Sequence, residues 1–179
     1  MLRILQGKYR NRRLILPPPE VVRPMGQRMR EAIFNILRHR YACIWEGQSV
    51  LDVFAGSGSI GLEALSRGAN PVFFIERSED IVQNFIRKNV RDDENAVIIN
   101  TNALAPYSLP CLVDVAFVDP PFGKDMVKKS LERVFPHMKE QSYIVVQQEL
   151  NASFVCPPGW RVDAERIYTY KHMRILCRD

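Results

Sequence analysis

Short apolar runs alternate with helical patterns along most of the chain. Runs rich in Val, Ile and Phe predict buried strands at 50–54, 71–76, 96–99, 113–118 and 142–147, and helical spacing of apolar residues predicts helices at 59–67, 79–90 and 125–138. Two further strands are expected at 161–167 and 173–178, with a turn near Lys171. Because apolar strands that alternate with helices are typical of parallel sheets, we expect an α/β fold. Its mostly parallel sheet is covered by helices on both faces.

The first forty residues follow a different pattern. Residues 2–6 and 12–16 are predicted as two short strands of a hairpin, with Gly7 between the two runs. Four prolines in 17–24 remove backbone donors and predict a linker or wrap. The segment "GQRMREAIFNILRHRY" then has the apolar spacing of a helix. We therefore expect a basic N-terminal hairpin and linker over residues 1–24 and one larger domain over residues 25–179.

Positive charge gathers at this N-terminal end. Residues 1–40 hold ten Lys or Arg and two Glu, a net charge of +8, whereas the whole chain carries +5 and its remaining part is therefore slightly acidic. A basic end on a slightly acidic body indicates a docking surface for a polyanion, and we expect nucleic acid to bind there. The candidate RNA-binding residues are Lys8, Arg10, Arg12, Arg13, Arg23, Arg28 and Arg30.

The remaining composition is that of an ordinary globular protein. Hydrophobic residues make up 46% of the chain and charged residues 25%. The longest apolar runs are far shorter than the roughly 20 residues of a membrane span, and the N-terminus has no signal-peptide pattern. The four cysteines are scattered and form no Cys/His cluster. We therefore expect a cytoplasmic, monomeric protein with reduced cysteines, no membrane partner and no metal site.

Candidate ligand-binding residues follow the predicted strands, at the edge of the sheet where such folds bind ligands. Asp52 ends the first strand, and Gly56, Gly58 and Gly61 follow it with the G-x-G-x-x-G spacing. Gly56 and Gly58 are expected to form the turn, and Gly61 to allow close packing of the next helix. Glu76 ends the second strand, and Asn102 follows the third.

The carboxylate beside the glycines points to a cationic ligand. A dinucleotide would place its pyrophosphate at the glycine turn, where Asp52 would repel it. S-adenosylmethionine carries a sulfonium and an ammonium group, which a nearby Asp attracts. Glu76 suits the ribose hydroxyls of either cofactor and does not discriminate between them. A second interpretation of Asp52 is a buried residue that caps the loop through backbone N–H groups, which is compatible with ligand binding.

The tetrapeptide Asp119-Pro120-Pro121-Phe122 points to the reaction class. Two prolines make a stiff loop just past a strand. Such a loop can aim the Asp119 carboxylate and the Pro120 carbonyl at the two N–H bonds of an exocyclic amine, while Phe122 stacks on the base. Catalysis by positioning and electrostatics then suffices for methyl transfer to this amine.

These residues carry a family resemblance that spans most of the chain. "DVFAGSGSIGLEALSRGA" and "DPPF" resemble motifs of class I methyltransferases, and "RILQGKYRNRRLILP" with "RPMGQRMREAIFNIL" resembles the RsmD family. The resemblance implies a Rossmann-like fold with a seven-stranded sheet, and S-adenosylmethionine as the donor. It also implies methylation of guanine N2 in 16S ribosomal RNA, at a guanine of the 966 type, within 30S particles or their assembly intermediates.

The resemblance assigns roles to individual residues. Asp52, Gly56 and Gly58 are expected to hold the methionine end of the donor, Glu76 its ribose, and Asp119 with Phe122 the target guanine. Further cofactor contacts are expected from the neighbouring residues Phe54, Arg77, Asn102 and Ala103, and the catalytic loop is Asp119, Pro120, Pro121 and Phe122.

The chain departs from the family pattern at three positions. Met25 and Gln27 stand where the family usually has Thr and an acidic residue. Asn102 stands where an Asp commonly binds the adenine amine, and its amide oxygen accepts a hydrogen bond without carrying charge. We therefore expect weaker donor binding than in a family member with Asp.

Other functions stay open at this point. An N6-adenine methyltransferase on DNA or RNA would use the same loop, although the short chain argues against a DNA-modifying enzyme. A nicotinamide-dependent reductase conflicts with Asp52 and the Asp-Pro-Pro-Phe loop. A non-catalytic RNA-binding or assembly protein would not need every loop residue.

Overall fold

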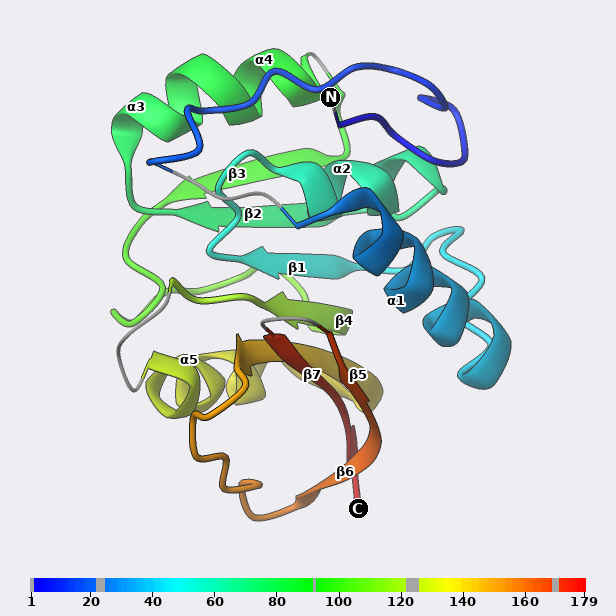
Figure 1. Ribbon diagram of the computed structural model, residues 1–179, viewed down its shortest axis with the longest axis vertical. Helices are drawn as coiled ribbons and strands as arrows, with labels where there is room; N and C mark the ends of the chain where they lie inside the picture. The colour runs from blue at the N-terminus through cyan, green and yellow to red at the C-terminus, as the bar shows by residue number, and fades with distance from the viewer. Residues whose placement is uncertain (1, 22–24, 92, 122–125, 169–170) are drawn as a thin grey trace.

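A computed structural model of the protein describes residues 2–21, 25–91, 93–121, 126–168 and 171–179. Its centre is a seven-stranded sheet in the order β3-β2-β1-β4-β5-β7-β6 (Figure 1). The strands are β1 (Val50–Val53), β2 (Val72–Glu76), β3 (Ala96–Asn100), β4 (Val113–Val118), β5 (Met138–Glu149), β6 (Trp160–Ile167) and β7 (Lys171–Arg178). The first five pair in parallel, whereas β7 runs antiparallel to both β5 and β6. The predicted mostly parallel α/β fold is confirmed.

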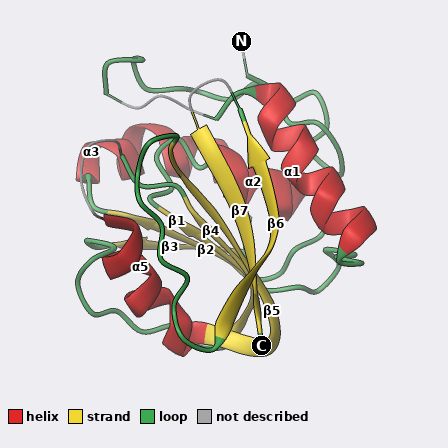
Figure 2. Ribbon diagram, turned by 60° about the horizontal axis from the view of Figure 1, so that its bottom comes forward, coloured by secondary structure: helices red, strands yellow, loops and turns green. Residues whose placement is uncertain are grey.

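Helices cover both faces of this sheet, as predicted (Figure 2). They are α1 (Gln27–Arg40), α2 (Ser59–Ser66), a helix that runs through α3 (Glu79–Ile81), a π-helical turn η1 (Val82–Ile86) and α4 (Arg87–Val90), then α5 (Met126–Val134) and the 3-10 turn η2 (Phe135–His137). Alternate strand residues face opposite sides: Val72 and Phe74 join the core with α1 to α4, while Phe73 and Ile75 join the core with α5.

Three predicted elements differ from the structure. The helix predicted to reach residue 138 ends at Val134, because Pro136 disfavours the α-helical conformation of the residue before it. The following strand starts at Met138, four residues earlier than predicted. Lys171, expected near a turn, opens β7. Lys171 therefore lies at the edge of the sheet where β5 ends and where the predicted ligand-binding residues are expected.

The two runs of the predicted N-terminal hairpin lie side by side, with one antiparallel bridge between Arg3 and Arg13. The Ile4 N–H donates to the Arg12 carbonyl at 3.0 Å, and the Leu14 N–H to the Leu2 carbonyl at 3.1 Å. This N-terminal arm (residues 2–16) packs on the domain, because Leu2, Ile4 and Leu14 lie in the same core as α1 and α2. Gly7 has φ +84°, and a Cβ there would lie 1.6 Å from the Ser66 carbonyl oxygen. Only glycine therefore permits this close approach of the arm to α2.

All four cysteines are free thiols. Within the described residues, no helix combines the length and the apolar character that crossing a membrane requires.

Candidate active site

The glycine turn after β1 depends on backbone conformations that favour glycine. Gly56 has φ +53° and Gly58 φ +73°. Gly61 lies in the first turns of α2, and a Cβ there would stand 2.3 Å from the ring of Phe74 in β2. The predicted roles of these glycines, a tight turn and close packing of the helix, are thereby confirmed.

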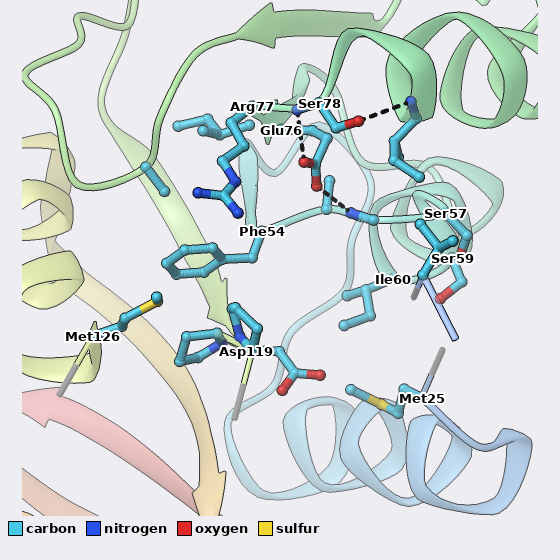
Figure 3. Close-up of a pocket in the computed structure, with 18 of the residues that line it drawn as sticks. Met25, Phe54, Ser57, Ser59, Ile60, Glu76, Arg77, Ser78, Asp119 and Met126 are labelled. Carbon is cyan, nitrogen blue, oxygen red and sulfur yellow. Dashed lines mark hydrogen bonds between the residues drawn. The ribbon is translucent and has the colours of Figure 1, made fainter. Parts of the chain in front are cut away.

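Two carboxylates fix this turn from within the protein. Asp52 Oδ2 accepts the Gly61 N–H at 2.9 Å. Glu76 Oε2 accepts the Gly56 N–H at 3.0 Å (Figure 3). The Gly58 N–H donates to the Ala55 carbonyl at 2.8 Å. Each of the three glycine N–H groups thus already has an acceptor in the protein, so none of them is left to bind a pyrophosphate.

Asp52 has the loop-capping role that was the second interpretation of this residue. Its side chain is buried behind the glycine turn, outside the wall of the cavity described below. Burial raises the pKa of Asp52 to about 8. The Gly61 N–H opposes this shift, and the carboxylates of Asp119 and Glu76 add to it. The expectation that Asp52 itself faces the charge of a ligand needs correction, because the carboxylates that face the cavity are others.

A cavity of about 570 Å³ opens at the carboxyl ends of β1, β2 and β4. This is the point where the strand order reverses, the usual ligand site of open α/β sheets. In Figure 3, Glu76 and Asp119 lie on different sides of the space next to Phe54. The volume is in the range of small-molecule and cofactor sites.

Most predicted site residues line this cavity. The structure brings together Phe54, Gly56, Glu76, Arg77, Asn102, Ala103, Asp119, Pro120 and Pro121. Gly58 supports the turn from behind the wall. Phe122 and Arg23 lie outside the described residues.

Hydrogen bonds to backbone N–H groups hold the side-chain oxygens of Glu76 and Asn102 in place. Glu76 Oε1 accepts the Ser78 N–H at 3.0 Å, so both carboxylate oxygens are held in place and keep lone pairs for a ligand hydroxyl. Asn102 is exposed, and its Oδ1 accepts the Leu104 N–H at 3.0 Å.

Asp119 has a partner that the sequence did not suggest. Lys171 Nζ lies 2.5 Å from Asp119 Oδ1 and 2.7 Å from Oδ2, and both residues line the cavity. Burial raises the pKa of Asp119, and the ammonium group of Lys171 offsets part of this effect. One feature of the sequence could have indicated this pair, namely the expected final hairpin with its turn near Lys171. If that turn lies at the carboxyl edge of the sheet, Lys171 lies at the same edge as Asp119.

Residues of the N-terminal part of the chain also line the cavity, which the sequence did not predict. Residues 19–21, in the predicted linker or wrap, line the cavity together with Met25 and Met29. Met25, one of the departures from the family pattern, is buried here, and its sulfur lies 3.9 Å from Gln147 Nε2. The segment therefore wraps over the site, and the cavity is built from both predicted parts of the chain.

One predicted RNA-binding residue is wrong. Arg30 is fully buried, where it forms an ion pair with Glu63 and donates a hydrogen bond to the carbonyl of Arg3. Glu63 also accepts the N–H groups of Leu5 and Gln6. Arg30 and Glu63 thus tie the N-terminal arm to α1 and α2, and Arg30 is not accessible to RNA.

The other described RNA-binding candidates differ in exposure. Arg10, Arg13 and Arg28 are exposed. Lys8 pairs with Asp93 at 2.9 Å and keeps nearly half of its side chain exposed. Arg12 is half-buried, because it donates to the Asn89 carbonyl oxygen.

The chain is similar to known proteins over nearly its whole length. The family model described as "Conserved hypothetical protein 95" matches residues 2–177. "Ribosomal RNA small subunit methyltransferase D" of Haemophilus influenzae is 33% identical over 92% of this chain and 88% of its own length. The protein of that name from Escherichia coli K12 is also 33% identical, over 99% of this chain and 90% of its own. The solved structure of "Putative methyltransferase yhhF from Escherichia coli" superposes with a TM-score of 0.85 and 31% identity, over 99% of this chain and 98% of that one.

Proposed function

The chain belongs to the Conserved hypothetical protein 95 family, the RsmD family, and from this premise we propose that it methylates the exocyclic N2 of a guanine in small-subunit ribosomal RNA, with S-adenosylmethionine as the donor. The proposed substrate is 16S rRNA within the 30S subunit or its assembly intermediate, at a guanine of the 966 type. The relatives' names support the coarse activity, and the chemistry of the cavity supports the finer part.

The observation that carries the choice of donor is the occupied glycine turn. Internal acceptors engage the N–H groups of Gly56, Gly58 and Gly61, which argues against a pyrophosphate-containing cofactor. Among the described residues, the cavity wall carries three acidic side chains, Glu20, Glu76 and Asp119, and two basic ones, Arg77 and Lys171. This excess of negative charge favours a ligand with positive charge. S-adenosylmethionine meets this description, and when bound it supplies an electrophilic methyl group.

The protein's own residues suit the remaining contacts. Glu76 offers lone pairs to ribose hydroxyls, and the backbone at Gly56 lets the methionine part pass close. Asn102 offers its amide oxygen to the adenine amine. These residues bind and orient the donor at the carboxyl edge of the sheet.

Asp119 and Pro120 are proposed to hold the target amine. A guanine amine is a poor nucleophile because its lone pair is delocalised into the ring. Acceptance of its two N–H bonds by the Asp119 carboxylate and the Pro120 carbonyl returns electron density to nitrogen and fixes its direction. The two prolines keep this loop stiff, and both line the cavity.

The exposed basic side chains of the N-terminal arm are proposed to bind RNA phosphates. Arg10 and Arg13 lie on the arm, and Arg28 lies on α1. The arm is fixed to α2, so these cations are held in one orientation relative to the domain. We also propose that the protein acts as a monomer.

The test is methyl transfer from radiolabelled S-adenosylmethionine to separated, unmethylated ribosomal subunits, followed by nucleoside analysis. Label in N2-methylguanosine from the small subunit is expected. Label in N6-methyladenosine would replace guanine by adenine as the target, and absence of donor binding would overturn the proposal. Asp119→Asn should lose activity, whereas Asp114→Asn, at the other end of β4, should retain it.

A further inference from the structure

We propose that Lys171 is a positioning residue for Asp119: its ammonium group holds both carboxylate oxygens in one orientation, so that the remaining lone pairs face the amine of the target base. This inference rests on the proposed function, because it gives Asp119 the role stated there. It adds a residue from the last strand, β7, to the predicted site residues, which lie at or after the ends of the first four strands.

The geometry of the pair carries the inference. Lys171 Nζ contacts Asp119 Oδ1 at 2.5 Å and Oδ2 at 2.7 Å, so the ammonium group bridges the two oxygens. A single contact would let the carboxylate rotate about its Cβ–Cγ bond, whereas the bridge fixes its plane. Charge-assisted hydrogen bonds of this length are the strong ones.

The topology explains why a residue so distant in sequence reaches Asp119. Asp119 follows β4 directly, at the carboxyl end of the parallel strands. Since β7 runs antiparallel to β5, its first residue, Lys171, pairs with Glu149, the last residue of β5. The start of β7 therefore lies at the edge of the sheet where β4 and β5 end.

The pair is sheltered from water yet borders the cavity. The side chain of Lys171 is 9% exposed and that of Asp119 17%. In such surroundings the attraction between opposite charges is stronger than at the surface, and an unpaired carboxylate would be costly. Lys171 thus favours the charged form of Asp119 at a place where burial favours the neutral acid.

Other charged groups near Asp119 do not replace Lys171. Asp52, in β1, interacts with Asp119 through like charge. This repulsion makes it less favourable for both carboxyl groups to be ionised at once. Glu20 and Glu76 add negative charge to the cavity wall, and the cation Arg77 lies beyond the end of β2. Among the described residues that line the cavity, Lys171 is the cation that contacts Asp119.

The chain offers a matched control at the opposite end of β4. Lys139 pairs with Asp114 at 2.8 Å, and neither residue lines the cavity. Lys139→Met therefore removes a Lys–Asp ion pair next to the same strands without touching the site. Lys171→Met removes the pair proposed to matter, and Lys171→Arg restores a positive charge with a different geometry.

The first measurement follows the ionisation of Asp119 directly. The carboxyl carbon of ¹³C-labelled Asp119 is assigned by comparison with Asp119→Asn and titrated by NMR. Lys171→Met should raise the midpoint by about 1 pH unit or more, as expected for loss of an opposite charge. Lys139→Met should leave the midpoint unchanged. A midpoint in Lys171→Met within 0.3 unit of the wild-type value would overturn the inference.

The second measurement distinguishes a role of Lys171 in positioning Asp119 from a role in the stability of the fold alone. In the methyl-transfer assay, Lys171→Met should lower kcat about tenfold or more, change the KM for the donor less than threefold, and move the acid limb of the pH profile upward. Lys171→Arg should recover part of kcat. Equal kcat in Lys171→Met and wild type, or a loss seen equally with Lys139→Met, would refute the positioning role.

Two outcomes need separate treatment. If Lys171→Met does not fold, Lys171→Gln, which keeps polar contacts without charge, is judged by the same two limits. If the wild-type protein methylates no guanosine, the proposed function fails, while the NMR titration still decides whether Lys171 controls the ionisation of Asp119.

Discussion

Gly61 of α2 lies against the ring of Phe74 of β2 so closely that a Cβ would stand 2.3 Å from the Phe74 Cε1 atom. Gly61→Ala should therefore destabilise the protein by about 2 kcal/mol, because overpacking costs about 1–3 kcal/mol or more and the helix preference of Ala returns about 1 kcal/mol. Gly26→Ala is the control, since a Cβ there meets nothing within 4 Å. Urea unfolding measures both, and equal losses would contradict the packing argument.

The buried carboxyl of Asp52 makes stability depend on pH in an unusual direction. Its pKa is raised to about 8 in the folded protein from its ordinary value of 3.8, so between these values the folded state binds more protons than the unfolded state. Its contribution to stability is therefore present at low pH and is lost as pH rises toward 8. We expect Asp52→Asn to gain stability relative to wild type by about 1 kcal/mol per pH unit across this range. Urea unfolding at pH 5, 6.5 and 8 measures the trend. A difference that is constant with pH would contradict it.

Donor binding should release protons near neutral pH. A cation in the cavity favours the carboxylate form of nearby acids, and Asp52 has a pKa of about 8 and interacts with Asp119 and Glu76 of the cavity wall. Calorimetry at pH 7.5 in buffers of different ionisation enthalpy should detect this release with S-adenosylmethionine. It should detect less with the product S-adenosylhomocysteine, which lacks the sulfonium charge. Asp52→Asn should reduce the release. Identical heats in all buffers would show that Asp52 does not sense the ligand.

Local patterns in the sequence were sufficient for the order of helices and strands. The apolar runs that became β1, β2 and β4 are almost fully buried and bounded by turns, so their positions followed from composition and length. The start of β5 was missed because Glu140 and Gln141 are exposed polar residues within a strand. The hairpin at the N-terminus is present, but its strands are shorter than predicted, since Leu5 and Tyr9 next to its turn donate their N–H groups to Glu63 and Ser66 of α2.

The site was predictable only where one sequence segment defines one contact. Gly56, Glu76 and Asp119 lie at or shortly after the carboxyl end of a strand, and the fold brings such residues together. The long-range pairs were not readable: Lys171 reaches Asp119 through an antiparallel strand, and Arg30 turns inward to meet Glu63. A basic residue in a sequence does not reveal whether its charge faces solvent or a buried acid.

The exposed arginines of the N-terminal arm make a prediction about salt. Arg10→Ala and Arg13→Ala should each weaken binding to small-subunit RNA and reduce the slope of log K against log salt by about 1, because each phosphate contact releases about one counterion. Arg161→Ala removes an exposed arginine on β6 and serves as the control. Filter binding at salt concentrations from about 50 to about 200 mM measures the slope. An unchanged slope in both arm variants would place the RNA elsewhere.

Asn102 is the position where this chain can be improved as a donor-binding protein. Its side chain is exposed at the cavity, and its amide oxygen already accepts the Leu104 N–H at 3.0 Å. Asn102→Asp keeps that acceptor and gives the second oxygen a charge, and hydrogen bonds to charged groups are worth about 1 kcal/mol more than neutral ones. We expect S-adenosylmethionine to bind about fivefold more tightly, measured by calorimetry.

The control for this substitution is Asn151→Asp, which adds the same charge at an exposed turn away from the cavity. General attraction of a cationic ligand by added negative charge would strengthen binding in both variants alike. A gain confined to Asn102→Asp would instead show that the side chain contacts the donor. Unchanged or weaker binding in Asn102→Asp would mean that the adenine amine lies beyond reach of residue 102, and the donor would then have to be oriented by Glu76 and the glycine turn alone.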